Sequence, residues 1–85
     1  MDLFLLTADR LAPGRAGRIE SLPDAGPLSQ RLMELGLIPG ALLLRRHTAP
    51  AGSPIAFEAG GTLLALRTAD AARITVREVE SPWTA

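Results

Sequence analysis

The chain has 85 residues, of which nine are basic and nine acidic, so its formal net charge is zero. This length allows one domain around one core, and an apolar fraction of 47% with 21% charged residues is typical of a folded domain. The charge balance removes the attraction on which non-specific nucleic-acid binding depends, and the absence of cysteine excludes disulfides, iron–sulfur clusters and thiolate zinc sites.

The N-terminal stretch MDLFLLTADR lacks the pattern of a secretory signal. Asp2 stands where a signal peptide carries positive charge, and the apolar run is short. Elsewhere no stretch approaches the roughly 20 apolar residues that span a bilayer. We therefore expect a cytoplasmic protein without membrane insertion, folded as a single domain over residues 1–85.

A proline–glycine pair at positions 13 and 14 marks a turn after a short lead in which no element is predicted. Residues 15–22 carry Ile19 and Leu22 with weak alternation, which favours a strand. The following stretch PDAG, residues 23–26, ends this strand.

Residues 27–35 change to a helical period, which places Leu28, Leu32 and Leu35 on one face. Pro27 suits the first helical position, because its missing N–H has no partner there in any case. Gly36 suits the position just past the helix end, where a left-handed backbone is needed. If the helix ends in a Schellman motif, Leu37 folds back onto Leu32.

The sequence from Ile38 to Ala41 has proline and glycine at the two central positions of a type II turn, Pro39 and Gly40. The chain is thus predicted to pass directly from a two-turn helix into a strand over residues 41–49. This strand contains a leucine run without alternation, so the pattern does not assign its buried face, although Leu43 is expected in the core.

The C-terminal half predicts a hairpin and a last strand. The loop at residues 50–54 precedes a strand at residues 55–59, and Gly60 with Gly61 forms the turn to a strand at residues 62–67. Residues 68–72 predict one helical turn, capped by Thr68 or Asp70. Residues 73–79 alternate as a half-buried strand with Val76 in the core, and residues 81–85, with Trp83, are expected to fray.

These elements predict a mainly β fold, a small SH3-like barrel of about five strands with one short helix between the first and second strands. Barrel closure is expected because a short open sheet leaves edges that pair with other chains. An OB-fold is the competing architecture, although its strands are usually longer.

Three segments in order resemble the FeoA family. They are RLMELGLIPGALL at residues 31–43, the loop with Ala49-Pro50, Gly52 and Pro54, and LALRTADAARITV at residues 64–76. The backbone-setting positions of this resemblance are Gly36, Pro39, Gly40, Pro50, Gly52 and Pro54. The chain departs from the family pattern at Ser53, where aspartate is usual, and at Arg45 and Arg46, where apolar strand residues are frequent.

The resemblance implies an SH3-like barrel that serves as a cytoplasmic partner of FeoB, the membrane transporter for ferrous iron, which carries a GTP-binding domain. A similar barrel forms the C-terminal domain of iron-dependent repressors of the diphtheria-toxin-repressor type. The resemblance does not imply that the chain itself binds iron.

No constellation for catalysis or metal binding is found in the sequence. His47 is the only histidine, whereas a ferrous site needs several nitrogen or carboxylate ligands. No motif places His47 and a carboxylate beside a serine, and the phosphate-binding motifs GxxxxGK[ST] and GxGxxG are absent. We therefore expect no enzymatic activity, no cofactor and no metal.

The remaining expectation is protein binding. The candidate partner-binding residues, around the helix end and its turn, are Arg31, Met33, Leu37 and Ile38; the alternative is that the apolar ones pack into the barrel. Arg45, Arg46 and His47 could form a small basic patch for nucleic acid, although a solvated strand end is the preferred interpretation. A detached metal-regulator domain is the third alternative, without the winged-helix region, and weak self-association is left open.

Overall fold

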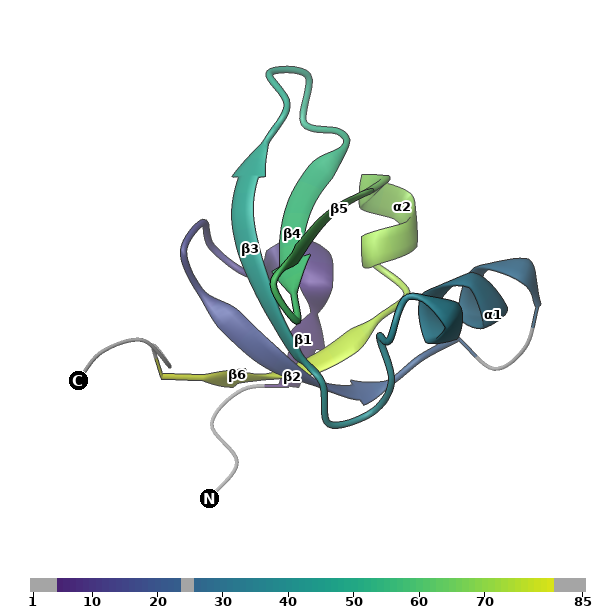
Figure 1. Ribbon diagram of the computed structural model, residues 1–85. Helices are drawn as coiled ribbons and strands as arrows, with labels where there is room; N and C mark the ends of the chain where they lie inside the picture. Colours follow the sequence, from purple (N-terminus) through teal and green to yellow (C-terminus); the bar gives the residue numbers. More distant parts are fainter. Residues whose placement is uncertain (1–4, 24–25, 81–85) are drawn as a thin grey trace.

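The sheet of this protein bends around one core, with a short helix standing beside it (Figure 1). The computed structural model describes residues 5–23 and 26–80, so the predicted tail with Trp83 lies outside the described residues. The elements, in chain order, are β1 Leu5–Thr7, the 3-10 helix η1 Ala8–Arg10, β2 Ala16–Ser21, α1 Pro27–Glu34, β3 Leu42–Thr48, β4 Ile55–Ala59, β5 Thr62–Leu66, α2 Thr68–Ala71 and β6 Thr75–Val79.

The six strands form one antiparallel sheet in the order β1-β6-β2-β3-β4-β5. The mainly β prediction is confirmed, but two of its details are wrong. β1 was not predicted, because three residues are too few to show a period, so α1 lies between the second and third strands. The sheet is also not closed into a barrel, since β1 and β5 remain its two edges.

Two irregularities bend the sheet. The pairing of β2 with β6 shifts between Ile19 and Ser21, and the pairing of β3 with β4 shifts between Arg45 and His47. Such bulges increase local twist and let a strand turn toward the opposite side of the sheet. The sheet therefore curls around its core without closing by hydrogen bonds.

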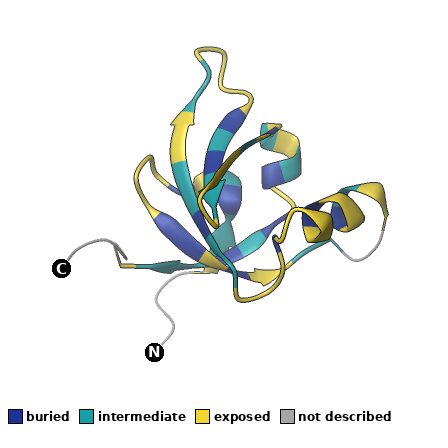
Figure 2. Ribbon diagram, in the orientation of Figure 1, coloured by how far each residue is buried: buried dark blue, intermediate teal, exposed yellow. Residues whose placement is uncertain are grey.

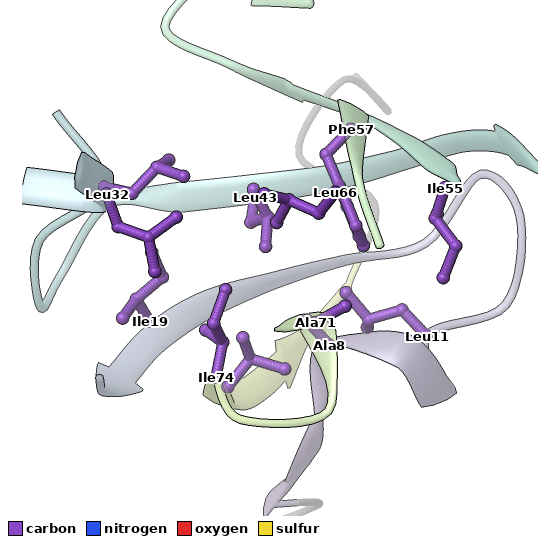
Figure 3. Close-up of a cluster of buried hydrophobic side chains, with 12 residues drawn as sticks. Ala8, Leu11, Ile19, Leu32, Leu43, Ile55, Phe57, Leu66, Ala71 and Ile74 are labelled. Atoms are coloured by element: carbon purple, nitrogen blue, oxygen red, sulfur yellow. The ribbon is translucent and has the colours of Figure 1, made fainter. Parts of the chain in front are cut away.

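The core gathers side chains from nearly every element. Leu32 of α1, Leu43 of β3, Phe57 of β4 and Ile74, just before β6, are fully buried and face one another (Figure 3). Val76 is also fully buried, so both core residues expected from the sequence are confirmed. In contrast, most of α1 is exposed (Figure 2), because the helix meets the core through one edge only.

Candidate protein-binding surface

The end of α1 is a Schellman motif. Leu37 N donates to Leu32 O at 2.9 Å, and Gly36 N donates to Met33 O at 3.0 Å. Gly36 has φ +86°, a left-handed conformation that costs glycine little and other residues more. The predicted helix end is confirmed, together with the contact between Leu37 and Leu32 in the core.

A type II turn follows within two residues. Ala41 N donates to Ile38 O at 2.9 Å, and Gly40 at its third position has φ +93°. The turn is also attached to β2, because Gly40 N donates to Ile19 O at 2.8 Å and Arg18 Nη1 donates to Gly40 O at 3.1 Å. The connection from α1 to β3 is therefore fixed at both ends and in the middle.

This connection displays three large apolar side chains. Met33 is 52% exposed, and Leu35 and Ile38 are each 50% exposed. We call these three residues the apolar ridge. A groove adjoins it between the end of α1 and the β4–β5 hairpin, lined among others by Arg18, Leu35, Leu42, Ala59 and Thr62.

The structure separates the predicted partner-binding residues into two groups. Arg31, Met33 and Ile38 are exposed, as a binding role requires. Leu37 is fully buried, so its assignment to the binding surface is wrong. Leu35, expected on the buried face, is exposed, because the turn at Gly36 brings Leu37 instead onto Leu32.

The loop with Pro50, Gly52 and Pro54 connects β3 to β4 away from the apolar ridge. Ala49 N donates to Pro54 O at 3.0 Å, and Gly52 O accepts a bond from Thr68 Oγ1 at 2.7 Å. Ser53 Oγ accepts a bond from Thr68 N at 3.1 Å. The first residue of α2 is thus capped from this loop, and the predicted cap by Thr68 or Asp70 is wrong.

Arg45 does not belong to a solvated basic patch. Its Nη1 donates to Asp9 O at 2.9 Å and to Leu11 O at 2.7 Å, and its Nη2 donates to Thr48 Oγ1. The guanidinium thereby holds the chain at the end of η1. Its neighbour Arg46 pairs with Glu58 at 3.5 Å, which leaves little free positive charge on this strand.

The described residues offer neither a metal-binding cluster nor a membrane-spanning helix. Within residues 5–23 and 26–80, no three or more His, Cys, Asp or Glu side chains form a group that could hold a metal ion. Over the same part of the chain, no helix has the length and apolar character needed to cross a bilayer.

The family model of the FeoA domain matches residues 6–78. The chain belongs to the FeoA family. Its members are associated with ferrous iron transport, and the matched region includes α1, the turn and every strand except the first residue of β1 and the last residue of β6. No curated protein matches this FeoA chain.

Solved structures agree with this assignment. A FeoA protein from Chlorobium tepidum is 34% identical with a TM-score of 0.82, covering 87% of this chain and 70% of its own. FeoA from Stenotrophomonas maltophilia, solved with zinc, is 29% identical with a TM-score of 0.74. The match covers 84% of this chain and 88% of the Stenotrophomonas chain. Its description as a prokaryotic SH3 domain protein supports the SH3-like fold. A manganese-dependent transcriptional repressor shares the fold alone. It is 16% identical with a TM-score of 0.78, and the match covers 88% of this chain and 42% of the repressor chain.

Proposed function

We propose that this FeoA protein is a cytoplasmic accessory protein of ferrous iron uptake, without enzymatic activity or cofactor, that binds the cytoplasmic portion of the FeoB transporter. The observation that carries the proposal is the apolar ridge. Single exposed apolar residues are ordinary, but here Met33, Leu35 and Ile38 lie within six residues of each other, each about half exposed. Methionine is enriched at protein interfaces, and clustered exposed apolar side chains mark surfaces that bind other proteins.

Rigidity supports the same role. The backbone around the ridge is held by the Schellman bonds of Gly36 and Leu37 and by the turn bond of Ala41. A surface that is already ordered loses little conformational entropy when it binds, so more of the contact energy contributes to affinity. The family assignment links this chain to ferrous iron transport, and FeoB is the partner that the resemblance implies.

The proposal is tested by calorimetric titration of the chain with the cytoplasmic portion of FeoB. We expect the double variant Met33→Ser/Ile38→Ser to bind at least about 10-fold more weakly, since truncated interface anchors often cost more than about 1 kcal/mol each. The matched control is Leu5→Ser, because Leu5 is 53% exposed on β1, outside the ridge. Equal affinities of the double variant and wild type would contradict the role of the ridge.

A further inference from the structure

One edge of the sheet has backbone groups available for pairing. β5 is paired with β4 alone, in a register that matches Ala59 with Thr62 across the turn Gly60-Gly61. In a two-residue hairpin this first pair is hydrogen-bonded, and such pairs alternate along the ladder. The N–H and C=O groups of Leu63 and Ala65 therefore point away from β4, and in the described part of the chain no other backbone bond involves them.

This edge lies beside a groove whose other wall is α1. The groove is lined by Leu66 and Arg67 at the end of β5, by Ala65, and by Pro27, Leu28 and Arg31 of α1, with Pro54 and Asp70 at its border. Leu28 and Leu66 pack against the core and give the groove an apolar floor. The side chain of Leu63, on the same strand but nearer the Gly60-Gly61 turn, is 61% exposed.

The charge of the groove favours an acidic ligand. Arg31 and Arg67 are both exposed, and over residues 5–23 and 26–80 neither guanidinium has an ion-pair partner. Asp70 is the single acidic residue of the lining. Guanidinium groups bind carboxylates through paired, charge-assisted hydrogen bonds, and an exposed strand edge binds an extended chain through its backbone.

We propose that the β5 edge and the facing side of α1 bind an extended segment of the partner protein, which joins the sheet as a further strand next to β5. An acidic side chain of that segment lies between Arg31 and Arg67, and its apolar side chains contact Leu28, Leu63 and Leu66. This proposal rests on the proposed function, in which FeoB supplies the segment. The backbone of β5 provides the affinity, and the two arginines select an acidic sequence.

The first test separates backbone pairing from side-chain contact at one position. Ala65→Pro removes the outward N–H, whereas Ala65→Ser keeps it and changes an exposed side chain by one hydroxyl. With the cytoplasmic portion of FeoB as the probe, we expect Ala65→Pro to weaken binding at least about 10-fold and Ala65→Ser to bind as wild type does. Thermal unfolding of both variants shows whether the proline is tolerated in this edge strand.

The second test is independent of the proline. Amide hydrogen exchange of the wild-type chain should slow at Leu63 and Ala65 when the FeoB portion is added, while Leu64 and Leu66, already bonded to β4, change little. The double variant Arg31→Gln/Arg67→Gln should bind about 10-fold more weakly and lose most of the salt dependence of binding. Matched substitution of Arg46→Gln and Arg73→Gln, two arginines outside the groove, should leave affinity unchanged.

The possible results distinguish failure of the strand-pairing proposal from failure of the proposed function. If wild type binds but exchange at Leu63 and Ala65 is unchanged, or the arginine variant binds equally, the strand-pairing proposal is overturned and the proposed function stands. If wild type does not bind FeoB at all, both are overturned. If these two amides are protected instead by self-association of the chain, a second copy occupies the edge, and the proposal is again overturned.

Discussion

Two connections in this protein lead into neighbouring strands, and they are stabilised in different ways. The connection from α1 to β3 is held mainly by bonds among its own residues, from Leu32 to Ala41. The connection from β1 to β2 is held from a distance, because Ala8 N donates to Ile74 O at 2.9 Å and Arg45 donates to the carbonyls of Asp9 and Leu11. Local turn chemistry fixes the first segment, and long-range polar contacts fix the second.

This difference bears on function. The segment held mainly by its own turns carries the apolar ridge, and its remaining bonds run to β2 at Gly40 and Ala41. The segment held by Arg45 carries a fully buried pair, Ala8 and Leu11, and contributes to the core rather than to a binding surface. The core, Arg45 and the helix end should therefore contribute to stability by different amounts.

The largest effect is expected for Leu32→Ala. Leu32 is fully buried between α1 and the sheet, so its truncation should lower the free energy of unfolding by about 2–5 kcal/mol. Leu35→Ala, at the C-cap of the same helix but 50% exposed, should change the free energy of unfolding by less than about 0.5 kcal/mol. Urea unfolding of both variants measures the free energy of unfolding. Equal losses of stability in the two variants would show that α1 is not attached through Leu32.

An intermediate effect is expected for Arg45→Met. The variant removes charge-assisted bonds to the carbonyls of Asp9 and Leu11, which should cost about 1.5–3 kcal/mol. Amide exchange should accelerate at Ala8 and Leu11 while the amides of Gly36 and Leu37 remain protected. Arg46→Met, which breaks only an exposed pair with Glu58, should cost at most about 1 kcal/mol. Unchanged exchange at Ala8 in Arg45→Met would contradict the long-range anchoring.

The smallest effect is expected for Gly36→Val. A Cβ at this position meets no atom within 4 Å, so we expect the left-handed backbone conformation to set the cost. It should be about 1–2 kcal/mol, with a smaller loss for Gly36→Asn, since asparagine tolerates the left-handed region better. Chemical denaturation provides the values. A neutral valine would mean that the helix end does not depend on the left-handed residue.

The same contrast explains what the sequence predicts and what it does not. Proline and glycine specify the end of α1, the turn at Pro39-Gly40 and the β4–β5 hairpin, so the sequence predicts these features with nearly the observed bounds. β1 is three residues long and depends on pairing with β6, which no local pattern records. The sequence predicts Arg45 as a solvated strand residue, because the carbonyls of Asp9 and Leu11 that its guanidinium bonds lie far away in the chain.

The candidate site was predicted in part for the same reason. Met33, Ile38 and Arg31 are exposed, as their positions in the helix and turn indicate. Leu37 is a candidate binding residue in the sequence, with packing into the core as the alternative, and the Schellman motif buries it against Leu32. The open edge of β5 could not be predicted, because it follows from the order of the strands in the sheet and not from their sequences.

The central claim, that the exposed end of α1 serves ferrous iron uptake, is tested most directly by complementation. A strain that lacks this gene is supplied with the wild-type chain or with Met33→Ser/Ile38→Ser, and ferrous iron uptake is measured at limiting iron. We predict that wild type restores uptake and that the double variant, folded and present at the same level, does not. Full restoration of uptake by the double variant would contradict the claim.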